Sequence, residues 1–347
     1  MQKRDLAVLA REAFEEGKRL IAPLMGSPGV ELIGSNIKIA QQNFGEHYKV
    51  IKKLVDTFSA DIVFPLMDLS VEANAIGRYT IFPKQHSATV PKDSFHPEEI
   101  ERFREINLSF DSRVIGYVET MKLMSIGLSK DVIKGAYVTG PYTVAALIMG
   151  ASEAAMATIK YADDLHKLCD LTTEKIEEYV RLLISAGAEV IFILEPSAVM
   201  LGPKQFQEFS AFYVKHINHS CKYSGVKVIY HTCGNTMHLI EKMVEADVGG
   251  LSLDSKETGV NLPGVAKRVP ENVVVIGNIN PTTTMLFGNP EDVRREVVEL
   301  LDAMKMYPNF ILSTGCDLPQ ETPWENIHAF MNAGRQYNAL SSENMRR

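Results

Sequence analysis

Short apolar runs rich in β-branched residues alternate with longer amphipathic stretches along almost the whole chain. This alternation constrains the fold more than any other feature of the sequence, because each run is long enough only for one buried strand. The candidate strands are Leu20–Leu24, Asp61–Met67, Gly135–Val138, Glu189–Leu194, Lys227–Tyr230, Gly250–Leu253, Val273–Ile276 and Phe310–Ser313. Helical periodicity is expected in Tyr48–Phe58, Ser112–Ser125, Val144–Gly187, Pro203–Tyr223, Asn235–Ala246 and Pro290–Met306.

Eight strands that alternate with helices, with no linker between them, predict an α/β fold. We expect a single (β/α)8 TIM barrel domain over residues 1–347, with an N-terminal helical extension. A doubly wound open sheet is the rival architecture. It usually carries a glycine-rich phosphate turn after its first strand, and neither G-x-G-x-x-G nor G-x-x-x-x-G-K-[ST] occurs in this chain. The barrel is therefore favoured.

The composition of the chain indicates which kinds of partner and which cellular compartment to expect. The formal net charge of −7 argues against nucleic acid as the main partner, because phosphate binding needs a clustered basic surface. No apolar run approaches the roughly 18 residues of a membrane span, and the first twenty residues do not resemble a signal peptide. Four cysteines in a chain of this length do not form a disulfide framework. We expect a cytoplasmic protein without nucleic-acid or membrane partners.

The most specific chemical signal is a histidine and two cysteines at predicted strand ends. His231 and Cys233 flank one residue after the fifth candidate strand, and Cys316 follows the eighth. Residues i and i+2 of a strand face the same side, and all strand ends of a barrel open onto one mouth. Two thiolates and an imidazole suit Zn²⁺, and three protein ligands leave the fourth position open that a catalytic zinc requires. An H-x-C pair alone would more often be plain packing, so the metal interpretation depends on Cys316.

Acidic residues are a second feature of the strand ends. Glu195 and Asp254 are assigned catalytic roles, and Asp254 could orient His231 or approach the metal. Each acid has an alternative role as a helix cap or loop residue. The pocket for substrate or cofactor is expected to include Met25, Met67, Asp68, Tyr142, Asn280 and Asp317. Among the remaining candidates, we expect Cys169 and Cys221 to be buried, and His216 and His219 to be solvated.

Six segments of the chain resemble the uroporphyrinogen decarboxylase superfamily, and within it the corrinoid-dependent methyltransferases. These segments are VFPLMDLSVEANAIG at Val63–Gly77, TGPYTVAALIMG at Thr139–Gly150, HTCGNT at His231–Thr236, GLSLD at Gly250–Asp254, GNINP at Gly277–Pro281 and TGCDLPQETPWEN at Thr314–Asn326. The resemblance implies a (β/α)8 barrel and zinc ligands at His231, Cys233 and Cys316. It also implies a corrinoid (cobalamin) cofactor carried by a partner corrinoid protein, since this chain has no D-x-H-x-x-G motif of its own.

This chain differs from the uroporphyrinogen decarboxylases at several positions, and these differences indicate which branch of the family it resembles. The loop after the first predicted strand, APLMGSPG, lacks the arginines that hold the acidic side chains of a porphyrinogen in the decarboxylases. Those enzymes also carry a histidine where this chain has Cys316, and they lack the H-x-C pair. Asp68 does stand at the position of their key aspartate. The resemblance therefore favours methyl transfer over decarboxylation.

A single zinc site is compatible with methyl transfer in either of two directions. In the donor reaction, a small methylated compound such as a methoxylated aromatic gives its methyl group to a Co(I) corrinoid protein while zinc polarises the ether oxygen. In the acceptor reaction, a small thiol of the coenzyme M type takes the methyl group from methyl-Co(III). Asp254 and Asp317 stand where coenzyme M enzymes of the family tend to carry glutamate and glycine, and Lys256 is the only cation of the motif loops. These features favour the donor reaction.

Two alternatives remain. One is a decarboxylase-like enzyme, and the other is a protein of another class, a non-catalytic tetrapyrrole binder. Such a binder would hold its ligand without dependence on zinc. A homodimer and a monomer are both compatible with the sequence.

Overall fold

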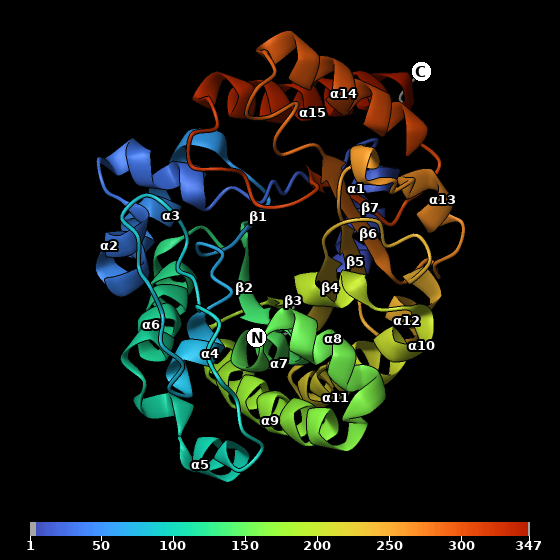
Figure 1. Cartoon of the computed structure of the whole chain (residues 1–347). Coiled ribbons are helices and arrows are strands. Elements are labelled where there is room, and N and C mark those ends of the chain that lie inside the picture. The colour runs from blue at the N-terminus through green and yellow to red at the C-terminus, as the bar shows by residue number, and fades with distance from the viewer. Residues whose placement is uncertain (1–4, 346–347) are drawn as a thin grey trace.

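The computed structural model describes residues 5–345, with side chains described for residues 5–339. Its centre is a sheet of seven parallel strands in which each strand pairs with the next along the chain. The strands are β1 (Ile62–Val63), β2 (Ile133–Thr139), β3 (Val190–Leu194), β4 (Lys227–Thr232), β5 (Gly250–Leu253), β6 (Val274–Ile279) and β7 (Phe310–Thr314). The sheet curls round, and helices surround it (Figure 1).

The expected first strand, Leu20–Leu24, is not a regular strand, which corrects the sequence prediction. Only Ile21 forms a bridge, to Leu312 of β7. Backbone hydrogen bonds still join the segment to both neighbours, since Ala22 N–H donates to Leu312 O (2.8 Å) and Asp61 N–H donates to Ile21 O (2.9 Å). Pro23 has no N–H for a longer ladder, and the Ile21 N–H is taken by the Asp61 carboxylate. The segment therefore closes the ring between β7 and β1 without being a full strand.

Helices follow the strands in the order expected of a (β/α)8 barrel, and the predicted fold class is confirmed. They are α1 (Leu6–Glu15), α2 (Ile37–Gln42), α3 (Phe44–Phe58), α4 (Val71–Ala75), α5 (Glu99–Glu105), α6 (Ser112–Gly127), α7 (Pro141–Met149), α8 (Ala151–Lys160), α9 (Ala162–Ala186), α10 (Pro203–Phe206), α11 (Phe212–Cys221), α12 (Ile240–Glu245), α13 (Leu262–Ala266), α14 (Pro290–Ala303) and α15 (Trp324–Met345). A π-helical turn, Gln207–Ala211, joins α10 to α11.

The expected continuous helix over Val144–Gly187 is divided into α7, α8 and α9. Gly150 has a φ of 97°, a conformation that favours glycine, and there the chain turns by 108° between α7 and α8. Within residues 5–345, no single helix is both long and apolar enough to cross a membrane; only α7 and α8 together pass that test, as a bent pair. Most of α7 is buried inside the protein.

Two apolar cores hold the fold together. The larger lies between the sheet and the surrounding helices, and the smaller fills the inside of the barrel. Leu6 and Ala10 of α1 belong to the inner core, together with residues at the start of β1 and β2 such as Ile62 and Ile133. The N-terminal helix therefore covers the amino-terminal end of the barrel, which leaves the opposite end, where the strands finish, for chemistry.

Candidate metal centre

The three predicted metal ligands meet at the carboxyl end of the barrel. His231 belongs to β4, Cys233 lies just beyond the end of that strand, and Cys316 lies just beyond the end of β7. Of all the His, Cys, Asp and Glu side chains of the described residues, these three form the only group with ligand atoms within 4.8 Å of one another. Residues 85 positions apart in sequence are thus brought to one point by the closure of the barrel.

The distances in this group fit a tetrahedral zinc site. Cys233 Sγ lies 3.3 Å from His231 Nε2 and 3.5 Å from Cys316 Sγ, and Cys316 Sγ lies 3.9 Å from His231 Nε2. Zn–S bonds of about 2.3 Å and Zn–N bonds of about 2.0–2.1 Å at tetrahedral angles require S–S separations of about 3.8 Å and S–N separations of about 3.6 Å. A zinc ion therefore fits among the three atoms with shifts of a few tenths of an ångström, and its fourth position has no protein ligand among the described residues.

Ser252, rather than Asp254, orients the histidine. Ser252 pairs with His231 across β4 and β5, and its Oγ lies 3.0 Å from His231 Nδ1. With Nδ1–H donating to the serine oxygen, Nε2 keeps the lone pair that a metal ion requires. Both side chains are buried, so the ring is held in this orientation.

Asp254 acts on the loop that carries Cys233. Its carboxylate accepts hydrogen bonds from the backbone N–H of Gly234 (2.7 Å) and of Ser255 (2.6 Å). Gly234 has a φ of 79°, which a residue with a side chain rarely adopts. Asp254 therefore fixes the turn directly after Cys233, and the catalytic role assigned to it stays a prediction.

Glu195 ties the end of β3 to the start of α7. Its carboxylate is fully buried and accepts hydrogen bonds from the Thr143 N–H (2.9 Å), the Thr143 hydroxyl (2.6 Å) and the Tyr142 N–H (3.1 Å). Burial raises the pKa of Glu195 to about 7, and these hydrogen bonds only partly oppose the shift. The contacts are those of a helix cap, and the catalytic role predicted for Glu195 remains untested.

Asp68 is engaged in a buried network rather than open to a ligand. One of its oxygens accepts hydrogen bonds from the N–H and hydroxyl of Ser70, and the other contacts the Arg113 guanidinium and the Tyr117 hydroxyl. Its side chain has no exposed surface. Arg113 thus neutralises the acid that stands at the position of the decarboxylase aspartate.

The other expected pocket residues divide into two groups. Met67 packs against the inner core, and one oxygen of Asp317 accepts a hydrogen bond from Ser27 (3.0 Å) while the other has no partner. Burial raises the pKa of Asp317 to about 7. By contrast, the Asn280 amide is occupied by hydrogen bonds within its own loop and with Ser255 and Glu257, while Met25 and Tyr142 belong to the outer core.

The predictions for the remaining cysteines and histidines are confirmed. Cys169 and Cys221 are buried in α9 and α11, and His216 and His219 are exposed on α11. The sequence reasoning missed Ser252 and Arg113, whose contacts with His231 and Asp68 are evident only in the structure. Ser252 carried a usable signal, since it precedes Asp254 by two residues and so faces the same side of its strand.

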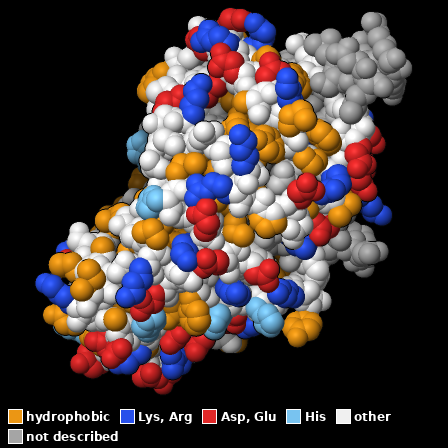
Figure 2. All heavy atoms as spheres, turned by 90° about the vertical axis from the view of Figure 1, so that its right-hand side faces the viewer, with side chains coloured by type: hydrophobic (Ala, Val, Ile, Leu, Met, Phe, Trp, Pro, Cys, Tyr) orange, Lys and Arg blue, Asp and Glu red, His pale blue; other side chains and the backbone are white. Residues whose placement is uncertain are grey.

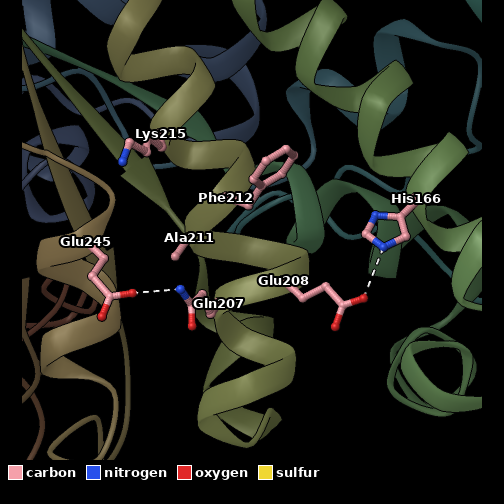
Figure 3. Close-up of a pocket in the computed structure, with 7 residues that line it drawn as sticks. All are labelled: His166, Gln207, Glu208, Ala211, Phe212, Lys215 and Glu245. Carbon is pink, nitrogen blue, oxygen red and sulfur yellow. Dashed lines mark hydrogen bonds and ion pairs between the residues drawn. The ribbon is translucent and has the colours of Figure 1, made fainter.

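A separate groove lies on the outside of the barrel, between α9, α11 and α12 (Figure 3). Its volume is about 670 Å³, and four of its polar side chains form two pairs: His166 Nε2 lies 3.2 Å from Glu208, and Gln207 donates to Glu245 (2.7 Å). None of the predicted site residues lines this groove. The cluster of His231, Cys233 and Cys316, and not this groove, therefore offers a set of metal-ligating side chains.

The fold and the site together define a parallel α/β barrel with a candidate three-ligand metal site at its mouth. Residues 34–337 match the uroporphyrinogen decarboxylase (URO-D) family, and the chain belongs to that family. This confirms the resemblance predicted from the sequence.

Similar proteins come from two branches of the family. A uroporphyrinogen decarboxylase of Prochlorococcus marinus is 30% identical over 250 residues, which cover 69% of this chain and 68% of the relative. The methylcobamide:CoM methyltransferase MtbA of Methanosarcina acetivorans is 25% identical over 257 residues, covering 73% of each chain. A solved methyltransferase structure from Methanosarcina mazei shares the fold, with a TM-score of 0.84 and 21% identity over 94% of this chain and 98% of the other.

Proposed function

We propose that this chain is a zinc-dependent methyltransferase that moves a methyl group between a small substrate and a corrinoid protein. The observation that carries the proposal is the group of His231, Cys233 and Cys316, which has the distances of a zinc site with one open position. The methyltransferase relatives support the same class of reaction. Zinc bound by these ligands would supply a Lewis acid that stabilises negative charge on the substrate atom.

The surroundings of the site favour the donor direction. Asp317 follows Cys316 in sequence, and the Asp254 carboxylate binds the backbone N–H of Gly234, the residue after Cys233. Two cationic side chains of the surrounding segments are already paired with acids. Lys256 is exposed and lies 3.8 Å from Glu299, and Arg113 binds Asp68. A sulfonate or carboxylate on a thiol substrate would therefore lie near acidic side chains without a free cation to pair with, which is unfavourable for an anion. A neutral methyl ether carries no charge and avoids this cost.

In the proposed reaction, a methoxylated aromatic is the donor. The bond between the methyl carbon and the ether oxygen breaks, and its electron pair stays on the oxygen, which leaves as a phenolate and later takes a proton. Co(I) of the corrinoid protein supplies the electron pair for the new cobalt–carbon bond and becomes Co(III). His231, Cys233 and Cys316 would hold the metal, Ser252 would keep the imidazole in the ligating tautomer, and Asp254 would hold the turn after Cys233.

Exposed apolar side chains in segments that follow barrel strands support docking of a protein partner. Large apolar side chains are exposed in the segments that come after β1, β3, β6 and β7 in the chain. They are Tyr79 (71% exposed), Met200 (61%), Phe287 (76%) and Trp324 (39%). On the side of the molecule shown in Figure 2, basic and acidic side chains are interspersed and form no continuous basic patch.

Two other functions have specific support. The MtbA relative favours methyl transfer to a thiol, which would use the same metal centre in the opposite direction. The decarboxylase relatives favour porphyrinogen chemistry, but Asp68 is bound to Arg113 and the loop APLMGSPG carries no arginine. A zinc-independent tetrapyrrole carrier has no use for an open metal centre.

The decisive experiment combines elemental analysis with a methyl-transfer assay. We expect about one zinc per chain in the purified protein, and loss of both zinc and activity in Cys233→Ala and Cys316→Ala with the fold intact. Cys221→Ala, which removes a buried cysteine of α11, is the matched control and should keep both.

Two assays decide the direction of transfer. Methoxylated aromatics with Co(I) cobalamin test the donor reaction, and methylcobalamin with 2-mercaptoethanesulfonate tests the acceptor reaction. Full activity in either zinc-ligand variant, or a zinc-free active protein, would refute the proposed function. Activity in the thiol assay alone would reverse its direction.

A further inference from the structure

The sulfur atoms of Cys233 and Cys316 lie 3.5 Å apart at the mouth of the barrel. The two cysteines are 83 positions apart in sequence and follow β4 and β7, which are not neighbours in the sheet. Both residues are only partly buried. The fold therefore places two thiols side by side at the edge of the solvent, which is the arrangement that a disulfide requires.

The segment after β5 holds both cysteine loops in place. The Asp254 carboxylate accepts a hydrogen bond from the N–H of Gly234 (2.7 Å), the residue after the first cysteine. Gly315, the residue before the second cysteine, packs so closely on the same segment that a Cβ atom there would lie 2.6 Å from the Ser255 nitrogen. The backbone of the protein itself therefore keeps the two thiols together.

Formation of a disulfide requires only a small movement from this geometry. An S–S bond is about 2.05 Å long, so the two sulfurs have to approach by about 1.5 Å. Neither cysteine lies within a strand or a helix, and neither belongs to the apolar cores of the fold. Rotation of the two side chains can therefore supply the movement without disturbing the sheet.

A bound zinc ion and a disulfide exclude each other at this site. Zinc binds each sulfur as a thiolate, whereas a disulfide removes both thiolates and leaves His231 as the one remaining ligand of the three. An imidazole alone does not hold zinc in the way that three ligands do. Oxidation of the pair would therefore abolish the metal centre, and bound metal would protect the pair from oxidation.

We propose that Cys233 and Cys316 form a reversible disulfide when the site is metal-free and a peroxide is present, and that this disulfide switches the site off. With hydrogen peroxide, the Cys233 sulfur takes one oxygen as the O–O bond breaks and becomes a sulfenic acid, and the other oxygen leaves as water. The Cys316 sulfur then displaces the hydroxyl group, which leaves with the thiol proton as a second water. The two thiols lose two electrons and the peroxide gains them, and a dithiol restores both thiols by exchange.

This inference rests on the proposed function only for its consequence. The proposed methyl transfer uses Co(I), which is a strong reductant and is itself lost under oxidising conditions. A thiol pair that closes under the same conditions would stop the metal centre and the corrinoid together, and would keep the cysteines from irreversible oxidation until reductant returns.

The test counts thiols and does not depend on turnover. The full chain is stripped of metal with a chelator, treated with hydrogen peroxide and denatured, and its thiols are alkylated and located by peptide mass spectrometry. We expect the four thiols of the chain to fall to two, with Cys233 and Cys316 in one linked peptide, because Cys169 and Cys221 are fully buried. The capacity to bind zinc should disappear with the disulfide and return after treatment with dithiothreitol.

Two comparisons sharpen the test. With zinc at about 100 times its dissociation constant, disulfide formation should slow about 100-fold, because only the metal-free fraction can react. Cys221→Ala is the matched control, which should still form the disulfide and keep one thiol. Cys316→Ala should form no disulfide within the chain.

The outcomes separate this inference from the proposed function. Metal-free protein that forms no disulfide between Cys233 and Cys316, or that forms one with Cys169, Cys221 or a second chain, would overturn the switch and leave the metal centre untouched. A rate of oxidation that bound zinc does not slow would also overturn it. Protein that forms the disulfide but binds no zinc would support the thiol pair and refute the proposed function.

Discussion

At the scale of single residues, the proposed metal centre would depend on side chains that do not touch the metal. The ligand atom of His231 is set by the hydrogen bond of its other ring nitrogen to Ser252, and the position of Cys233 by the Asp254 carboxylate on the next backbone N–H. Such supporting contacts hold ligands in place before the metal arrives, and so they determine affinity as well as geometry.

Ser252→Ala is expected to lower zinc affinity about 10- to 100-fold, because the imidazole loses the partner that fixes its tautomer and orientation. Competition with a chromophoric zinc chelator measures this directly. Ser313→Ala is a suitable control, since Ser313 is equally buried in β7 but donates to Ala22 O, away from the histidine. Equal zinc affinities for the two variants would contradict the role given to Ser252.

At the scale of elements, buried acids connect the ends of strands to helices that come earlier in the chain. Glu195 joins the end of β3 to the start of α7, and Glu72 of α4 accepts a hydrogen bond from the Thr139 N–H at the end of β2 (2.8 Å). The second oxygen of Glu72 has no partner. Burial raises the pKa of Glu72 to about 7, and hydrogen bonds, chiefly from the backbone N–H of Thr139, oppose the shift only in part.

The raised pKa of Glu72 predicts how the stability of the folded protein depends on pH. Because ionisation of Glu72 is less favourable in the folded protein than in the unfolded chain, its contribution to stability is present in full below about pH 4.5 and is lost as the pH rises through about 7. Relative to Glu72→Gln, the wild-type protein should lose up to about 3 kcal/mol of unfolding free energy over this range. Urea unfolding at a series of pH values measures the difference, and parallel curves for the two proteins would refute the assignment.

At the scale of the whole molecule, the two ends of the barrel have different tasks. The amino-terminal end is covered by α1, and the carboxyl end carries the three candidate metal ligands. This division matches the general organisation of (β/α)8 barrels, in which one end supplies stability and the other function.

Leu6→Ala is expected to destabilise the protein by about 2–5 kcal/mol, since it leaves a cavity between α1 and the inner core. Val8→Ala on the same helix should cost less than about 0.5 kcal/mol, because Val8 is 51% exposed. Chemical unfolding compares the two, and zinc content should stay the same in both. Equal stabilities would mean that α1 does not hold the barrel closed.

The sequence by itself determined the barrel of this protein and the grouping of its three candidate metal ligands. Strand and helix periodicity are local properties, and a barrel brings every strand end to one mouth, so His231, Cys233 and Cys316 could be grouped without coordinates. The sequence did not reveal the partners of Asp68, Glu195 and Asp254, because hydrogen bonds between distant residues depend on strand register and on side-chain direction. Only the tertiary structure decided that Arg113, 45 residues away, binds Asp68, and that Ser252 lies against His231.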